Sequence, residues 1–183
     1  MPFRILGFAG SLRRGSYNRG LLRAAQQVAP EGVEIEIAAL DEIPPYNQDV
    51  QSQGDPEPVR LFKERIRAAD ALLIATPEYN YSIPGVLKNA LDWASRPAAE
   101  SVLRRKPVAI MGASTGRMGT VRAQLALRQV FVFTESLALL KPEVLVSGAA
   151  GLFDADGNLL DDETRRRVRE LLEALVEWTQ RLR

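Results

Sequence analysis

Residues 7–19 of the chain read GFAGSLRRGSYNR, and this stretch decides which fold the sequence predicts. An apolar run over residues 3–9 predicts a buried strand before it, and apolar residues at helical spacing from Leu21 to Val28 predict a helix after it. A loop that leads into a helix N-terminus can hold an anion, because free backbone N–H groups point toward it. We therefore interpret the stretch as a phosphate-binding loop, with flexible glycines, short polar side chains and cations at Gly10, Gly15, Ser11, Ser16, Asn18, Arg13, Arg14 and Arg19.

An ordinary strand-to-helix connection is the alternative, with Ser16 or Asn18 as the helix cap. Three arginines within residues 13–19 favour the phosphate, since a plain turn needs none. The glycine spacing matches neither G-x-G-x-x-G nor G-x-x-x-x-G-K-[ST]. The sequence therefore predicts neither a dinucleotide-binding Rossmann loop nor a Walker loop.

Length and composition predict one domain over residues 1–183, because 183 residues with 46% apolar composition can bury one substantial core. The formal net charge of +1 argues against nucleic acid or an anionic membrane surface as a partner. The sequence has no signal-peptide pattern and no apolar run long enough to span a membrane. We expect a cytoplasmic protein.

The chain contains neither cysteine nor histidine. This excludes disulfides, thiol redox chemistry, thiolate or imidazole metal sites and histidine acid–base catalysis. Any difficult chemistry must then be carried by an organic cofactor. We accordingly expect no metal site and no catalytic side chain.

Further elements follow the first strand and helix in alternation. The helix predicted at residues 59–68 has Lys63, Arg65 and Arg67 outside its apolar face, and the connection over residues 41–58 has no regular periodicity. The alternation predicts an α/β fold, a parallel sheet with helices on both faces. The expected strands are residues 32–40 at a sheet edge, then 71–75, 107–113 and 144–146, and the other helices are residues 84–95, 120–133 and a last one after residue 161.

Loops at residues 10–18, 76–82 and 113–119 all follow predicted strands, so they should meet at the carboxyl edge of the sheet. There Pro77 and Tyr79 can wall a flat ring, while backbone N–H groups of residues 78–80 and 116–117 can bond its polar edge. A planar heterocycle with a phosphate tail fits these features. For Glu78, a hydrogen-bonding or structural role is favoured over that of a general base, and Trp93 and Trp178 are expected to be packing residues.

Three motifs strongly resemble the NADPH-dependent FMN reductase family, which includes quinone, chromate and azo-dye reductases. They are GSLR with SYN in the first loop, PYNQD at residues 45–49, and PEYNYSIPGVLKNALDW at residues 77–93. The resemblance implies a flavodoxin-like fold, with a five-stranded parallel sheet in the order 2-1-3-4-5. It also implies FMN as cofactor and NADPH or NADH as co-substrate.

Carried over motif by motif, the resemblance implies three groups of cofactor-binding residues. The FMN phosphate would be held by Ser11, Arg13, Ser16, Tyr17 and Asn18. The isoalloxazine and ribityl chain would be lined by Pro77, Glu78, Tyr79 and Asn80. The far edge of the ring would meet Ser114, Gly116 and Arg117. The role of Arg14 stays open between FMN, the NADPH phosphate and solvent.

The implied reaction is ping-pong: NADPH gives a hydride to FMN, and a small acceptor such as a quinone, flavin, azo compound or chromate then takes the electrons. The implied assembly is a homodimer or homotetramer with the flavin near an interface to which residues 84–95 contribute. Two other classes of protein remain as alternatives. One is a flavodoxin-type electron carrier without its own turnover, and the other is a flavin-free phosphate-binding or regulatory domain.

Overall fold

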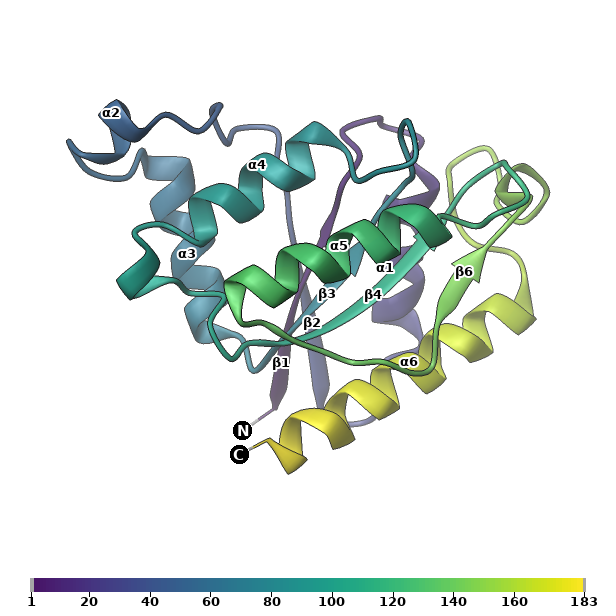
Figure 1. Ribbon diagram of the computed structural model, residues 1–183. Helices are drawn as coiled ribbons and strands as arrows, with labels where there is room; N and C mark the ends of the chain where they lie inside the picture. The colour runs from purple at the N-terminus through teal and green to yellow at the C-terminus, as the bar shows by residue number, and fades with distance from the viewer. Residues whose placement is uncertain (1, 183) are drawn as a thin grey trace.

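The computed structural model describes residues 2–182 as a twisted parallel sheet between two layers of helices (Figure 1). The strands are β1 Phe3–Ala9, β2 Val33–Ala38, β3 Ala71–Ala75, β4 Pro107–Ala113, β5 Leu137–Ala138 and β6 Val144–Val146. The α-helices are α1 Tyr17–Gln27, α2 Gln48–Gln51, α3 Glu57–Ala68, α4 Gly85–Ala94, α5 Val121–Thr134 and α6 Asp162–Arg181. Short 3-10 helices lie at Ala98–Glu100 and Ala149–Gly151.

The strand order is β2-β1-β3-β4, with β5 and β6 both paired to β4, and all pairings are parallel. The predicted order and the edge position of β2 are confirmed. The fifth position differs from the prediction, because two short strands fill it. β5 pairs with the start of β4 and β6 with its end, and the segment between them contains Pro142, which has no N–H for the ladder.

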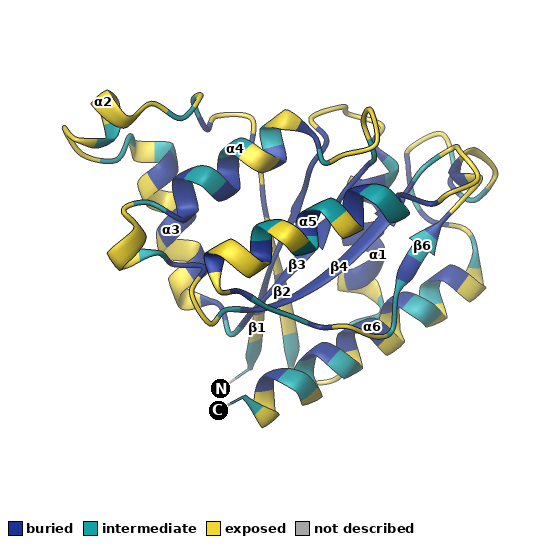
Figure 2. Ribbon diagram, in the orientation of Figure 1, coloured by how far each residue is buried: buried dark blue, intermediate teal, exposed yellow. Residues whose placement is uncertain are grey.

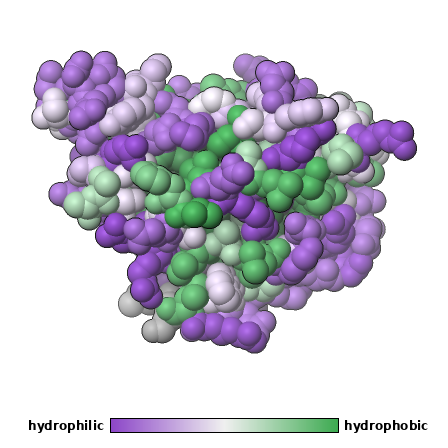
Figure 3. Space-filling model, viewed as in Figure 1, coloured by the Kyte–Doolittle hydropathy of each residue, from purple (hydrophilic) through white to green (hydrophobic). Residues whose placement is uncertain are grey.

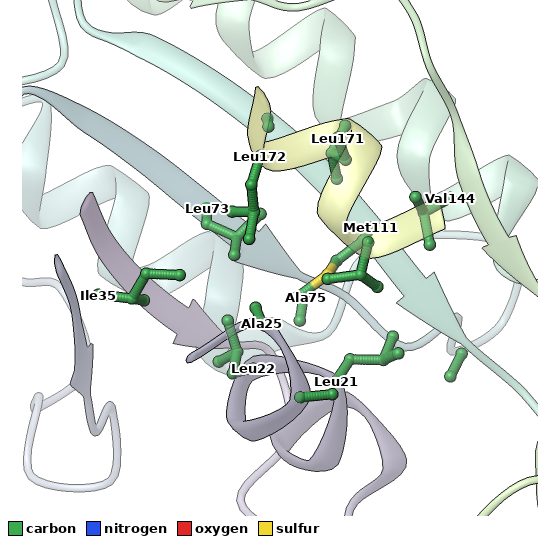
Figure 4. Close-up of a cluster of buried hydrophobic side chains, with 14 of the residues drawn as sticks. Leu21, Leu22, Ala25, Ile35, Leu73, Ala75, Met111, Val144, Leu171 and Leu172 are labelled. Atoms are coloured by element: carbon green, nitrogen blue, oxygen red, sulfur yellow. The ribbon is translucent and has the colours of Figure 1, made fainter. Parts of the chain in front are cut away.

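Both faces of the sheet are covered, so the core has two halves (Figure 2). Helices α1 and α6 pack on one face, and α3, α4 and α5 pack on the other. Figure 4 shows Leu22 of α1, Leu73 of β3, Met111 of β4 and Leu172 of α6 meeting in the first half. Each leucine buried in this way contributes roughly 1.5–3 kcal/mol to the stability of the fold.

The connection over residues 41–58 is more ordered than its sequence indicates, because it contains α2 and is attached to α4. The carboxamide of Asn89 accepts the N–H of Tyr46 and donates to the Pro44 carbonyl. The indole of the fully buried Trp93 donates to the same carbonyl at 2.8 Å. The PYNQD and LKNALDW motifs are thus partners in one packing contact, and Trp93 is the packing residue expected.

The prediction that Lys63 lies outside the apolar face of its helix is wrong. Its side chain is 3% exposed, and its ammonium group lies 2.6 Å from a carboxylate oxygen of Asp55. The same group donates to the Arg96 carbonyl at 2.7 Å. Helical periodicity could not reveal this, since the neutralising carboxylate comes from the preceding loop and not from the helix.

The described residues include no helix that combines the length and the apolar character needed to cross a membrane.

Close approach between α1 and the turn at residues 154–158 depends on Gly20. A Cβ atom added there would lie 2.2 Å from the Gly157 carbonyl oxygen, which is backbone and cannot rotate away. We expect Gly20→Ala to lower the free energy of unfolding by about 1–3 kcal/mol, measured by urea denaturation. The control is Gly85→Ala at the start of α4, where an added Cβ meets no atom within 4 Å. Equal urea midpoints for the two variants would contradict this packing.

Candidate active site

Three loops at the carboxyl edge of the sheet enclose one hollow of about 200 Å³. They follow β1, β3 and β4, as the sequence predicts, and lie together near the upper edge of Figure 1. Predicted site residues that line the hollow are Ser11, Arg13, Ser16, Tyr17, Asn18, Pro77, Glu78, Tyr79 and Ser114. Predicted residues outside its lining are Asn80, Gly116 and Arg117. Sequence reasoning missed Ala113 and Thr115, for which the only signal was their position in the third loop.

The first loop combines a helix cap with polar side chains that line the hollow. Ser16 is the N-cap of α1 and its hydroxyl accepts the N–H of Arg19, while the hydroxyl of Ser11 accepts the N–H of Arg13. Both serines are buried, and each still has its O–H to donate. The cap and the phosphate-binding interpretations of the loop are therefore compatible.

Arg13 is held at the wall of the hollow by an aromatic ring. Its guanidinium carbon lies 5.2 Å from the centre of the Tyr17 ring, within the range of a cation–π contact. Tyr17 in turn packs on Phe153, with ring centres 5.0 Å apart. The stacked arrangement fixes a positive charge beside the N-terminus of α1, where an anion is also favoured by the helix dipole.

Asn18 has mainly a positioning role. Its side chain forms two bonds with the backbone of Ala113, donating to the carbonyl and accepting from the N–H, both at 2.9 Å. The pair is buried and joins the start of α1 to the end of β4. For phosphate binding, these bonds leave the side chain of Asn18 one amide N–H, and its backbone N–H is not involved in them.

The second loop forms a tight hairpin. Tyr79 and Ser82 exchange two backbone bonds at 3.0 Å, and the residues between them, Asn80 and Tyr81, have φ angles of 50° and 67°. These angles are those of a type I′ turn, which suits asparagine but costs a tyrosine about 1 kcal/mol. A cation–π contact offsets this conformational cost, since the guanidinium of Arg122 lies 3.7 Å from the centre of the Tyr81 ring.

Glu78 connects this hairpin to α5. Its side chain is 8% exposed and accepts the backbone N–H groups of Arg122 and Ala123, together with the Nε–H of Arg122 at 2.6 Å. Thr120 precedes α5 without a side-chain cap of its own, so the carboxylate acts as the cap from a distant loop. With its oxygens engaged in this way, Glu78 is a structural residue and a poor general base.

The cation of Arg13 thus remains in the hollow, because the charge of Glu78 is balanced by Arg122. Within residues 2–182 no cluster of acidic side chains has the arrangement of a metal site. The fold is flavodoxin-like, and the hollow at the carboxyl edge of its sheet carries the positive charge of Arg13.

Comparisons with known proteins give the family. A model of the NADPH-dependent FMN reductase family matches residues 3–151. An NAD(P)H-dependent FMN reductase of Pseudomonas aeruginosa is 55% identical over 98% of this chain and 97% of its own length. A 2-hydroxy-1,4-benzoquinone reductase of a Burkholderia species is 42% identical over 97% of each chain. The solved structure of a flavoenzyme NAD(P)H:(acceptor) oxidoreductase from Paracoccus denitrificans superimposes with a TM-score of 0.88, at 34% identity and 97% coverage of both chains. The chain belongs to the NADPH-dependent FMN reductase family.

The cap that Glu78 provides can be tested by stability. We expect Glu78→Gln to lower the free energy of unfolding by about 1–3 kcal/mol, because a buried charged acceptor of several hydrogen bonds is lost. The measurement is urea denaturation, with Asp92→Asn as control. Asp92 pairs with Lys88 on the exposed side of α4, and its loss should cost at most about 0.5 kcal/mol. A Glu78→Gln variant as stable as the control would show that the cap contributes little.

Proposed function

We propose that this chain is an FMN-dependent NAD(P)H oxidoreductase that reduces small acceptors, quinones first among them, and that residues 1–183 form one FMN-binding domain. The observation that carries the proposal is the hollow, in which Ser11, Ser16 and Arg13 of the first loop adjoin Pro77 and Tyr79 of the second. We propose that these three residues form a cradle for an anion. Family membership supports it, as do relatives that are named FMN reductase and quinone reductase.

The cradle has the chemistry that the phosphate of FMN requires. Ser11 and Ser16 offer hydroxyl donors, and Arg13 offers a fixed positive charge. The N–H groups of Tyr17 and Asn18 precede the first bond of α1, which Gly20 donates to the Ser16 carbonyl, so they are free to face an anion. These residues would hold the phosphate.

The remaining lining would hold the flavin ring. Pro77 and Tyr79 supply flat apolar surface, and Ala113, Ser114 and Thr115 supply backbone at the opposite side of the hollow. We propose that Asn80, Gly116 and Arg117, which lie beyond the lining, contact the parts of the cofactor that extend past it. Glu78 would act through the hairpin that it anchors and not through a contact of its carboxylate.

FMN, when bound, accepts a hydride from NAD(P)H and delivers the electrons to a second substrate, so we propose a ping-pong reaction. The chain itself contributes binding, orientation and exclusion of water, together with backbone N–H donors near the ring. It supplies neither thiol nor imidazole, because it has no cysteine and no histidine. An acceptor therefore needs only access to the flavin, and we propose azo compounds, flavins and chromate as further acceptors on this ground.

An electron carrier is the rival function. Carriers dock on their partners through strongly charged surfaces, whereas this chain has a net charge of +1. The near-neutral balance favours an enzyme that acts on small molecules.

Steady-state kinetics test the activity. We expect purified protein loaded with FMN to oxidise NADPH continuously in the presence of 1,4-benzoquinone, with parallel double-reciprocal plots as the mark of the ping-pong order. Retention of FMN without turnover would instead identify a carrier. Failure to retain added FMN would favour the flavin-free regulatory domain.

Arg13→Ala tests the cradle by FMN binding and by the same steady-state assay. Loss of a charge-assisted hydrogen bond should weaken FMN binding roughly 10- to 100-fold in a fluorescence titration, with NADPH oxidation restored by excess FMN. The control is Arg60→Ala on the outer face of α3, where Arg60 pairs only with exposed glutamates. If both variants bind FMN as tightly as the parent, the phosphate does not occupy this loop.

We also propose that the chain forms a homodimer through α5. Leu125, Val132 and Phe133 on the outer side of this helix are 55%, 81% and 74% exposed, and apolar side chains gather across this face in Figure 3. Exposed apolar side chains that gather in this way mark an interaction surface. The expected contribution of residues 84–95 has less support, because the exposed residues of α4 are Gly85 and Lys88. A second copy fits as occupant, since its own α5 would present the same apolar side chains in a two-fold contact.

Light scattering tests the dimer. We expect the double substitution Val132→Glu and Phe133→Glu to give a monomer, because it places four carboxylates in a two-fold interface. Leu160→Glu, at another exposed leucine, is the control and should leave the parent mass unchanged. A parent protein that is itself monomeric would overturn this assignment without touching the proposed activity.

A further inference from the structure

A second hollow, of about 290 Å³, lies at the opposite edge of the sheet from the candidate active site. It is placed between the C-terminal ends of α3 and α6 and the turn that leads into β4, on the side of the molecule where Figure 1 marks both chain termini. Its lining carries three consecutive basic residues. The lining residues are Ala69, Asp70, Arg104, Arg105, Lys106, Pro107, Thr179 and Leu182.

Lys106 differs from the other lysines of the chain in its hydrogen-bond partner. The ammonium groups of Lys63, Lys88 and Lys141 each lie within 2.7 Å of a carboxylate oxygen. The ammonium group of Lys106 instead donates to the backbone carbonyl of Ala69 at 2.7 Å, and among the described residues it has no carboxylate at ion-pair distance. Among the described residues no carboxylate therefore bonds directly to this ammonium group, and Asp70 acts on it only from a longer distance.

The surroundings of Lys106 favour the free amine. Burial lowers the pKa of Lys106, and the negative charge of Asp70 opposes this only in part. A larger fraction of neutral amine at physiological pH makes a lysine a better nucleophile.

Arg104 and Arg105 can bind a phosphate group next to this amine. The guanidinium of Arg104 forms an ion pair with Glu135 at 3.1 Å, and both side chains are exposed. Such a pair is weak, so a bound anion can replace Glu135 as the partner of Arg104. Arg105 is anchored by its backbone, whose N–H donates to the Glu135 carbonyl, and no described acidic side chain pairs with its guanidinium. The hollow thus combines an anion-binding pair with a nucleophile.

We propose that Lys106 is an acylation site that reacts with acyl phosphates. The two arginines hold the phosphate of the donor, and the Lys106 amine attacks the acyl carbon. A nitrogen–carbon bond forms, the carbon–oxygen bond to phosphate breaks, inorganic phosphate leaves, and the amine releases one proton to solvent. No oxidant or reductant takes part.

The fold tolerates this product. An acylated lysine keeps one N–H, which can still donate to the Ala69 carbonyl at the end of α3. The positive charge of Lys106 is lost, and no carboxylate of the described residues that was paired with it is left behind. Because the hollow lies at the amino edge of the strands, the modification should leave FMN binding unchanged, so this site and the proposed function are tested separately.

The experiment uses acetyl phosphate as the probe. The folded protein is allowed to react first, and it is then digested and its peptides are analysed by mass spectrometry. Cleavage at glutamates releases residues 101–135, in which Lys106 is the single lysine, whereas trypsin fails at the Lys106–Pro107 bond. We expect Lys106 to be acetylated at least about threefold faster than Lys88 or Lys141, although those side chains are 48% and 77% exposed. A rate at Lys106 no higher than at these two lysines would overturn the proposal.

Arg105→Asn separates phosphate binding from amine reactivity. The φ angle of Arg105 is 58°, and asparagine adopts this left-handed conformation readily, so the variant should fold. We expect it to slow the reaction of Lys106 with acetyl phosphate at least about threefold while leaving the reaction with an N-hydroxysuccinimide ester of acetate unchanged. If both reagents slow equally, or neither slows, the arginine does not bind the donor and the proposal fails.

Discussion

Burial of the sheet on both faces is the constraint on which the rest of this structure depends. Strand β3 is buried along its whole length, and β4 likewise, so neither face of the sheet has room for polar chemistry. Polar side chains can then gather only where strands end. Because all strands run parallel, the loops that follow them meet at one edge, and that edge holds the hollow described above.

Two contacts between distant segments turn these separate loops into one site. Asn18 joins the first loop to the third through the backbone of Ala113. Glu78 joins the second loop to the N-terminus of α5 and, through Arg122, supports Tyr81 in its left-handed conformation. Both polar side chains therefore preorganise the hollow through bonds within the protein. Preorganisation of this kind suits a protein whose chemistry is supplied by a cofactor.

The motifs of the family are in part packing motifs. The PYNQD stretch contacts α4 through Tyr46, whose N–H donates to Asn89 and whose ring packs on Trp93, so two of the three signature stretches are adjacent because they hold each other in place. Gly20, two residues after the SYN stretch, also serves packing, because its lack of a side chain lets α1 approach the turn at Gly157. Resemblance in such motifs reports the fold as strongly as it reports the site.

The sequence by itself determined the order of strands and helices, the parallel sheet and the positions of the three loops, because hydrophobic periodicity and turn residues are local properties of the chain. The family also followed from the sequence alone, through the resemblance of its motifs.

Only the tertiary structure decided which side chains are free to act. The carboxylate of Glu78, the amide of Asn18 and the ammonium group of Lys63 meet partners 44, 95 and 8 residues away, and spacing along a sequence carries no record of such pairs. The split of the last strand position into β5 and β6 was likewise decided by pairing with β4, since two isolated short strands have no stability of their own.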